Sequence, residues 1–121
     1  MRARRLSRAL SRIYSDELRP HGVTAPQLNL LVALGVAGAL SPARLASALD
    51  LEKSTLSRNL RVMESAGWVS VAREGAGQSV SLTDAGQALL ADLRPAWERA
   101  QARAQALLGD EIAGALLRIP T

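Results

Sequence analysis

The stretch that decides the fold runs from Ser41 to Thr83 and reads SPARLASALD, LEKSTLSRNLRVMESAG, WVSVAREGAGQSVSLT. Its first ten residues predict a short helix. Ser41 is a good N-cap, and Pro42 suits the first helical position, where its missing N–H costs nothing. Leu45 and Leu49 then fall on one face. The pattern predicts a helix that begins after Ser41 and buries one side.

A second helix follows after a turn of only two residues, Asp50 and Leu51. It is predicted to run from residue 52 or 53 to residue 66, because Gly67 fits the position just past a helix C-terminus. An apolar stripe recurs at i, i+4 and i+7 and consists of Leu56, Leu60 and Met63. The opposite face carries small hydroxyl groups and arginines, namely Ser54, Ser57, Arg58 and Arg61.

Two alternating segments come next, residues 68–73 and 79–82, joined by the turn-rich loop Glu74–Gln78. They predict a β-hairpin. Two helices head to tail followed by a hairpin are typical of a winged helix-turn-helix, which places its second, recognition helix in the major groove of DNA.

The exposed face of the second helix is the predicted DNA-contacting surface. Its small hydroxyl side chains allow close approach, and the helix dipole and backbone N–H groups favour phosphate at the N-terminus. An arginine one turn further along can hold guanine through two hydrogen bonds. Arg73 and Gln78, at the base and the tip of the hairpin loop, could reach the adjacent minor groove or backbone, and the alternative is a loop without contact to DNA. The predicted DNA-binding residues are Lys53, Ser54, Thr55, Ser57, Arg58, Arg61, Arg73 and Gln78.

These residues resemble the MarR (multiple antibiotic resistance regulator) family of winged-helix transcription factors. The matching pieces follow one another in order over residues 5–108. They are Thr24-Ala25-Pro26-Gln27, Leu45-Ala46, Lys53-Ser54-Thr55-Leu56-Ser57-Arg58, Met63-Glu64-Ser65-Ala66-Gly67-Trp68-Val69, Arg73, and Ser81-Leu82-Thr83-Asp84-Ala85-Gly86. The resemblance implies a homodimeric regulator that binds inverted-repeat operators and is often released by a small ligand. A repressor is the expected form.

Two departures from the family pattern stand out. The wing of the family usually carries an Asp and an Arg near its tip, whereas this loop is shortened to Glu-Gly-Ala-Gly-Gln at residues 74–78. Glu52 stands where the family often has an N-capping Asp, and Glu is a poorer cap.

The composition limits the classes of protein to which the chain can belong. The 121 residues carry a net charge of +4, which favours nucleic acid only mildly. Aromatic residues make up 2% and cysteine is absent, which argues against base-stacking RNA readers and excludes disulfides and thiol redox sensing. No run of residues is typical of a membrane span or a signal peptide, so a cytoplasmic protein without membrane contact is expected.

The flanking segments predict a dimerisation region. Residues 3–18 form an amphipathic pattern with Leu6, Leu10, Ile13 and Leu18 inward, and five arginines lie at Arg2, Arg4, Arg5, Arg8 and Arg12. Thr24 and Gln27 have the spacing of a capping box for a nearly all-apolar helix that ends at Ala37. Its apolar residues Leu28, Leu31, Val32 and Leu34 cover nearly all of its sides, so this helix is expected to be the central buried one.

A last long helix is predicted from Asp84 to about Leu108, capped by Thr83 and kinked at Pro95. It would span roughly 38 Å, more than a domain of this size needs for its own core. Its inner face is assigned to Leu89, Leu90, Leu93 and Trp97, with Ala96, Ala100, Ala102, Ala104 and Ala106 allowing close approach. Gly109 is expected to break the helix. A short tail helix then begins at Asp110 and carries Ile112, Leu116 and Leu117.

The expected fold is therefore mainly α with a small β-hairpin wing and about six helices. One domain covers residues 1–121, with the DNA-binding winged helix at about 24–83 and dimerisation helices at about 3–19 and 84–119. A homodimer on an inverted-repeat operator follows from this arrangement.

Catalysis has little support. His21 is the only histidine, and no phosphate-binding loop, metal cluster or nucleophile-base set is visible, so no enzyme, cofactor or metal is expected. An effector pocket near Tyr14, His21, Trp68 and Trp97 is implied by the resemblance alone. The residues themselves favour the other interpretation, a loop histidine and core aromatics. The alternative function is a winged-helix protein–protein interaction module, although its exposed face lacks large apolar anchors.

Overall fold

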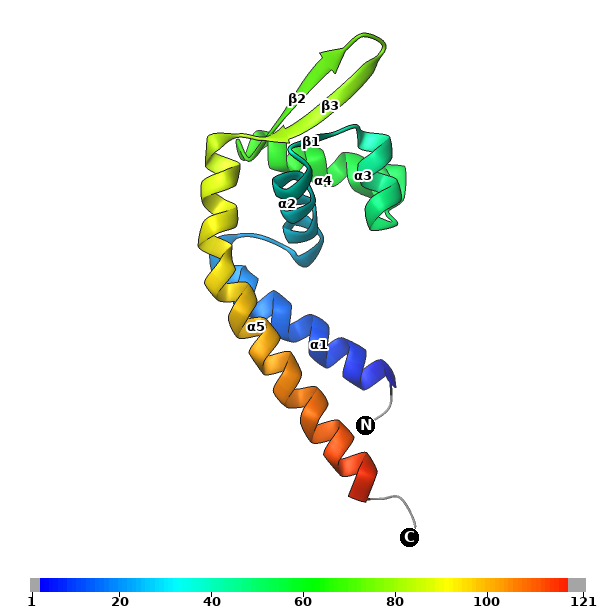
Figure 1. The fold of residues 1–121 in the computed structure, drawn as a ribbon, viewed down its shortest axis with the longest axis vertical. Helices are drawn as coiled ribbons and strands as arrows, with labels where there is room; N and C mark the ends of the chain where they lie inside the picture. Colours follow the sequence, from blue (N-terminus) through cyan, green and yellow to red (C-terminus); the bar gives the residue numbers. More distant parts are fainter. Residues whose placement is uncertain (1–2, 118–121) are drawn as a thin grey trace. The chain divides into compact units, whose positions relative to one another are not determined.

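The computed structural model describes residues 3–117, with side chains described as far as residue 114 (Figure 1). The side chains of Arg2, Leu116 and Leu117, and the end of the expected tail helix, lie outside the described residues. In chain order, the elements are α1 (Ala3–Leu18), η1 (Arg19–His21), α2 (Ala25–Ala37), β1 (Ala39–Leu40), α3 (Pro42–Leu49), α4 (Lys53–Ser65), β2 (Val69–Glu74), β3 (Gly77–Leu82) and α5 (Asp84–Leu117).

The chain divides into two compact units. The winged-helix unit comprises residues 24–92, and the terminal-helix unit comprises residues 1–23 and 93–121. The winged-helix unit thus includes the first residues of α5 as well as the predicted helix-turn-helix and hairpin.

Two helix starts in the winged-helix unit confirm the predicted caps. The Thr24 hydroxyl accepts from the Gln27 backbone N–H at 3.3 Å, and the Gln27 side chain accepts from the Thr24 backbone N–H at 3.1 Å. These reciprocal bonds form a capping box at the start of α2. The Ser41 hydroxyl accepts from the Arg44 N–H at 3.2 Å, with Pro42 at the first turn of α3. The two helices therefore begin where the sequence predicts.

Helix α2 is less enclosed than expected. Leu28, Leu30, Leu31 and Leu34 are buried. Val32, predicted to be buried, is 43% exposed because the helical period places it on the side away from Leu30 and Leu34. When apolar residues occur on nearly all sides of a helix, the sequence does not indicate which side the neighbouring elements cover.

Helix α4 ends in a Schellman motif. Gly67 has φ +83°, the left-handed region that glycine adopts without a Cβ penalty. Its N–H donates to the Glu64 carbonyl, and the Trp68 N–H donates to the Met63 carbonyl. The motif confirms the predicted end of the helix.

The sheet contains one strand more than predicted. The order is β1-β3-β2, all antiparallel, and the short strand β1 pairs Ala39 with Ser81 and Leu40 with Val80. The expected five-residue loop Glu74–Gln78 is wrong, because Glu74 pairs with Gly77 and only Gly75 and Ala76 form the turn. A glycine first in a two-residue turn suits the twist of a hairpin, so the strands extend further than their apolar alternation indicates.

Helix α5 is continuous from Asp84 to Leu117, through both Pro95 and Gly109. The expected break at Gly109 and the separate tail helix are therefore wrong, so the described residues form five α-helices and one 3-10 turn. A single glycine costs only about 1 kcal/mol relative to alanine in a helix, which a long run of helix formers tolerates. Leu93 is buried as predicted, whereas Trp97 is 40% exposed and does not belong to the inner face.

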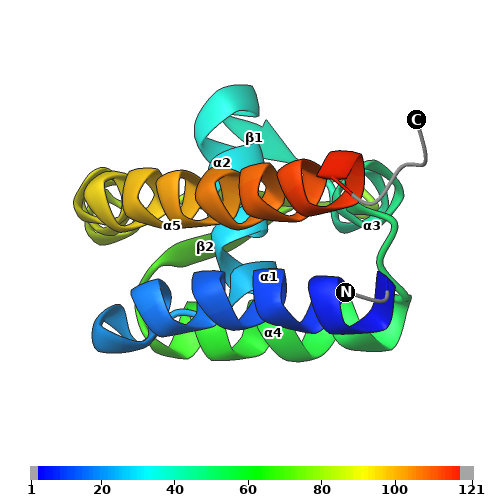
Figure 2. The ribbon, with the colours of Figure 1, turned by 90° about the horizontal axis from the view of Figure 1, so that it is seen from below.

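In the terminal-helix unit, α1 and α5 run in opposite chain directions (Figure 2). The buried residues of this unit are Ile13, Leu18, Val23, Leu93, Ala96, Ala100 and Ala104. Of the predicted inward side chains of α1, Ile13 and Leu18 are buried and Leu6 and Leu10 are half-buried. Alanines spaced three or four residues apart leave room for another helix to approach α5 closely.

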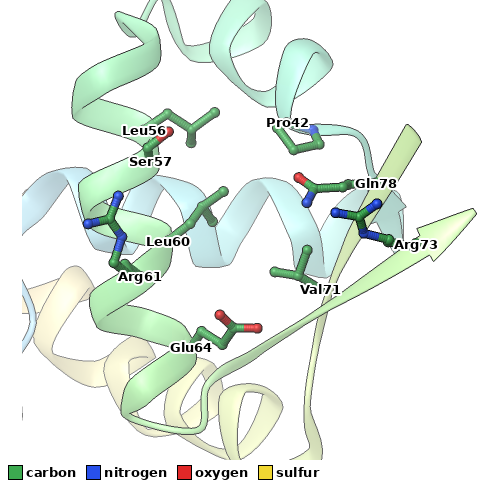
Figure 3. A pocket seen from close by; sticks show the side chains of 9 residues that line it. All are labelled: Pro42, Leu56, Ser57, Leu60, Arg61, Glu64, Val71, Arg73 and Gln78. Carbon is green, nitrogen blue, oxygen red and sulfur yellow. The ribbon is translucent and has the colours of Figure 1, made fainter. Parts of the chain in front are cut away.

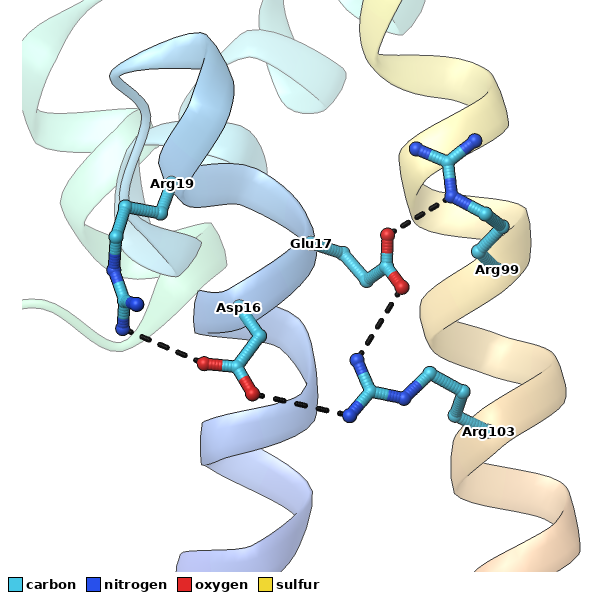
Figure 4. Close-up of polar contacts among 5 residues, drawn as sticks. All are labelled: Asp16, Glu17, Arg19, Arg99 and Arg103. Atoms are coloured by element: carbon cyan, nitrogen blue, oxygen red, sulfur yellow. Dashed lines mark hydrogen bonds and ion pairs between the residues drawn. The ribbon is translucent and has the colours of Figure 1, made fainter.

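Ion pairs join α1 to α5 in this unit (Figure 4). Glu17 receives hydrogen bonds from Arg99 Nε at 2.9 Å and Arg103 Nη1 at 3.3 Å. Arg103 also lies 3.8 Å from Asp16, which pairs with Arg19 at 3.4 Å. The hydrogen bond from Arg99, followed by the bond from Arg103 and the charges of both arginines, lowers the pKa of Glu17, although partial burial opposes this effect.

No helix within residues 3–117 combines the length and the apolar character needed to cross a bilayer.

The start of α5 allows a test of close packing. A Cβ at Gly86 would lie 2.0 Å from the Trp68 carbonyl oxygen, so Gly86→Ala must displace backbone. We expect it to lower the free energy of unfolding by about 1–3 kcal/mol, measured by urea titration. Gly109→Ala is the control, because a Cβ there meets nothing within 4 Å and should raise helix stability. Equal effects of the two substitutions would contradict the packing at Gly86.

The Glu17 ion pairs predict a pH dependence. Because the pKa of Glu17 is lowered in the folded state, its contribution is complete above the ordinary pKa of a glutamate and is lost as the pH falls through the lowered value. We expect Glu17→Gln to be less stable than the parent protein at pH 7 and the gap to close in acid. Urea titrations across the acidic range measure this. A gap that is independent of pH, or an equal effect from Glu98→Gln on the exposed side of α5, would contradict the prediction.

Candidate nucleic-acid interface

Helix α4 is oriented by its apolar stripe. Leu56, Leu60 and Met63 are buried, and α4 contacts both α3 and β2. Since these residues recur at i, i+4 and i+7, their burial turns the opposite face of the helix outward. Ser54, Ser57, Arg58 and Arg61 are all exposed.

The register of the hairpin decides which wing residues share a face. Arg73 pairs directly with Gln78, and Val71 pairs with Val80. Because side chains alternate along a strand, Arg73 lies on the same face as Val71, two residues away. Arg73 and Gln78 therefore lie opposite each other, one pair from the turn, and not at the base and the tip of a loop as predicted.

A groove of about 410 Å³ lies between α4 and the hairpin (Figure 3). The apolar lining of the groove consists of Pro42 from α3, Leu56 and Leu60 from α4, and Val71 from β2. The polar lining consists of Ser57, Arg61 and Glu64 from α4 and Arg73 and Gln78 from the hairpin. Helix α4 thus supplies one wall of the groove and the hairpin supplies the opposite wall.

The structure brings four of the eight predicted DNA-binding residues around this groove: Ser57, Arg61, Arg73 and Gln78. Lys53, Ser54 and Arg58 are exposed on α4 but do not line the groove. Thr55 is half-buried, and its carbonyl accepts a hydrogen bond from the Asn59 side chain at 3.0 Å. The predicted surface therefore divides into a groove wall and a separate exposed part of α4.

The N-terminal end of α4 retains donors for an anion. Glu52 occupies the N-cap position and makes no side-chain capping hydrogen bond, as its poor capping ability predicts. The first backbone N–H groups of a helix have no partner within the helix. With Lys53 beside them, they form a suitable position for a phosphate.

Sequence reasoning missed Glu64, Pro42 and Val71 as groove residues. Glu64 follows Arg61 by three residues and Ser57 by seven, so the helical period could have placed it on the same face. Pro42 and Val71 come from other elements and reach the groove only through tertiary packing. Glu64 reduces the positive charge that Arg61 and Arg73 give to the groove.

Within residues 3–117, no three His, Cys, Asp or Glu side chains are grouped so as to hold a metal ion. Three of the four predicted effector residues, Tyr14, His21 and Trp97, belong to the terminal-helix unit, and Trp68 belongs to the winged-helix unit. Tyr14, His21 and Trp68 are half-buried.

Two adjacent helices followed by an antiparallel hairpin, with a polar face on the second helix, define a winged helix-turn-helix protein. Comparison with family models matches residues 21–78 to the MarR family. Comparison with curated protein sequences gives no match.

Solved structures extend the match over most of the chain. The transcriptional regulator MosR of M. tuberculosis is 32% identical, with 93% of this chain and 87% of that chain covered and a TM-score of 0.74. AbsC, a MarR family transcriptional regulator from Streptomyces coelicolor, is 24% identical, with 93% and 82% covered and a TM-score of 0.79. Rv2887, a Mycobacterium tuberculosis MarR family protein in complex with salicylic acid, is 27% identical, with 96% and 91% covered and a TM-score of 0.70.

The chain belongs to the MarR family. It is a DNA-binding transcriptional regulator, and the family match over residues 21–78 falls almost entirely within the winged-helix unit.

Proposed function

We propose that this protein represses transcription as a homodimer that binds an inverted-repeat operator through α4 and the β2–β3 hairpin. One observation supports the proposal above all: the apolar stripe of α4 is buried, whereas its serines and arginines face outward beside a groove completed by Arg73 and Gln78. A helix with one anchored face and one small, basic face suits insertion into the major groove.

Each part of this surface has a distinct proposed role. Lys53, Ser54 and Thr55, at the first turn of α4, hold phosphate with the help of the helix dipole. Ser57, Arg58 and Arg61 meet base edges or phosphates further into the major groove. Arg73 and Gln78, which are adjacent on the wing, contact the neighbouring minor groove or backbone.

A homodimer fits the terminal-helix unit. Helix α5 has 34 residues, and Trp97, Leu108 and Ile112 are exposed apolar side chains along it. Burying them against a second copy would remove apolar surface from water. Two recognition helices related by a two-fold axis would enter successive major grooves about 34 Å apart, which requires an inverted repeat.

A small-molecule effector that releases DNA is the last part of the proposal. It is supported by similar proteins, including the Bordetella bronchiseptica regulator BpsR, whose DNA binding is regulated by 6-hydroxynicotinic acid. Tyr14, His21, Trp68 and Trp97 are the candidate contacts in this chain. A cytoplasmic location accompanies this role.

Substituting the arginines of α4 tests the DNA-binding role. A pool of random duplexes first selects the preferred site, and affinities are then measured by fluorescence anisotropy. We expect Arg58→Ala or Arg61→Ala to weaken binding by about 1–3 kcal/mol and to relax base preference where the arginine reads guanine. An arginine that contacts only phosphate should lower affinity for all sequences and reduce the salt slope by about one.

Arg94→Ala is the matched control, because it removes one exposed charge from α5 outside the winged-helix unit. Unchanged affinity in both α4 variants would reject α4 as the recognition helix. Failure of the parent protein to prefer any duplex would instead favour a protein-docking module.

Sedimentation equilibrium tests the homodimer. We expect a mass near twice 12.8 kDa at micromolar concentration. Ile112→Glu places a charge on the exposed apolar side of α5 and should raise the dimer dissociation constant at least tenfold, since burying one isoleucine contributes about 1.5–3 kcal/mol. Val36→Glu is the control, because Val36 is exposed on α2 in the other unit. A parent protein that sediments as a monomer contradicts the proposal.

A further inference from the structure

Thr83 connects two helix ends. Its hydroxyl accepts from the Gly86 backbone N–H at 3.0 Å and donates to the Gly67 carbonyl. Its own backbone N–H donates to the Trp68 carbonyl at 3.1 Å. Its carbonyl accepts from the Gln87 backbone N–H at 2.9 Å. Thr83 therefore takes part in four hydrogen bonds, and two of them reach a segment that lies about fifteen positions earlier in the chain.

The two ends that Thr83 joins are the C-terminal end of α4 and the first turn of α5. Gly67 and Trp68 are the residues that close the Schellman motif of α4. Gly86 lies in the first turn of α5, and a Cβ there would lie 2.0 Å from the Trp68 carbonyl oxygen. Hydrogen bonding and direct backbone contact thus fix the same pair of helix ends.

The N-terminal end of α4 is held differently. Glu52 makes no side-chain capping bond there, and Lys53 and Ser54 are exposed. Ser57 lies eight residues, or roughly 12 Å, from the end of α4 at Ser65, so a rotation of about 5° at the anchored end moves Ser57 by about 1 Å. Hydrogen bonds to base edges tolerate only a few tenths of an ångström, so the anchored end controls base contacts made far from it.

We propose that Thr83 is a positioning residue for DNA recognition. Its hydroxyl ties the end of α4 to α5 and so sets the angle at which α4 presents Ser57 and Arg61 to the major groove. The inference rests on the proposed function of α4. It assigns to Thr83 a task beyond capping α5, because a cap needs only an acceptor, whereas the bond to Gly67 needs a donor.

Thr83→Asp separates the two tasks. An aspartate accepts from the Gly86 N–H and caps the helix as well as threonine does, but as a carboxylate it cannot donate to Gly67. Thr24→Asp is the matched control. Thr24 is also an N-cap threonine of the winged-helix unit, so the substitution keeps a cap and adds the same charge without touching α4. Thr83→Ser retains both bonds.

Affinity for the selected operator duplex is measured by fluorescence anisotropy at two salt concentrations, and stability by urea titration. We expect Thr83→Asp to bind the operator about tenfold more weakly than Thr24→Asp. A tenfold loss corresponds to about 1.4 kcal/mol, which is the size of one hydrogen bond between neutral groups. The loss should persist at the higher salt concentration, since screening removes only the effect of the added charge. Binding to random duplex should change equally in the two variants, and Thr83→Ser should stay within about threefold of the parent.

Equal operator affinity of Thr83→Asp and Thr24→Asp overturns the inference and leaves the proposed function intact. A parent protein that fails to discriminate operator from random duplex overturns both. Amide hydrogen exchange on the parent protein gives an independent measurement should Thr83→Asp fail to fold. Protection of the Thr83 amide, which donates to the Trp68 carbonyl at the end of α4, supports the tie, and exchange at the rate of an unstructured chain overturns it.

Discussion

The burial of the apolar stripe of α4 is the constraint on which the rest of this structure depends. Leu56, Leu60 and Met63 each contribute about 1.5–3 kcal/mol when they leave water, a large fraction of the stability of a small domain. Rotating α4 about its axis would expose all three together. The same three contacts therefore hold the helix and direct its polar face outward.

The hairpin depends on this arrangement as well. Helix α4 contacts β2, and the pairing of Val71 with Val80 turns one face of the hairpin inward. Two residues further along the strand, the same face carries Arg73 opposite Gln78. A slip of one residue in the register would move both polar side chains to the other face and leave the groove without its second wall.

The charge distribution of the winged-helix unit favours DNA binding through a few well-positioned contacts and not through a broad basic surface. Glu64 shares the groove with Arg61 and Arg73, and Glu74 lies at the end of β2. Each carboxylate repels phosphate, so a protein of this kind loses non-specific affinity and keeps the contacts that its geometry aligns. Accurate placement of α4 matters more under these conditions than it would on a uniformly basic face.

The sequence by itself determined the order of the elements and the ends of most helices. Capping side chains, the left-handed Gly67 and the period of the α4 stripe are local signals, because each acts within a few residues of the chain. They also identified Ser57 and Arg61 as outward-facing. Predictions failed where local signals were weak. Helix α2 is apolar without a period, so its sequence did not indicate that Val32 would be exposed. The single glycine at Gly109 did not end α5.

Only the tertiary structure decided which residues meet. Strand β1 exists because Ala39 and Leu40 find partners on β3, and a two-residue strand has no signal of its own. The same applies to Pro42 and Val71 in the groove and to the contact of Thr83 with Gly67. The physical reason is that hydrogen bonding and packing between distant segments depend on where the folded chain brings them, which the pattern of neighbouring residues does not encode.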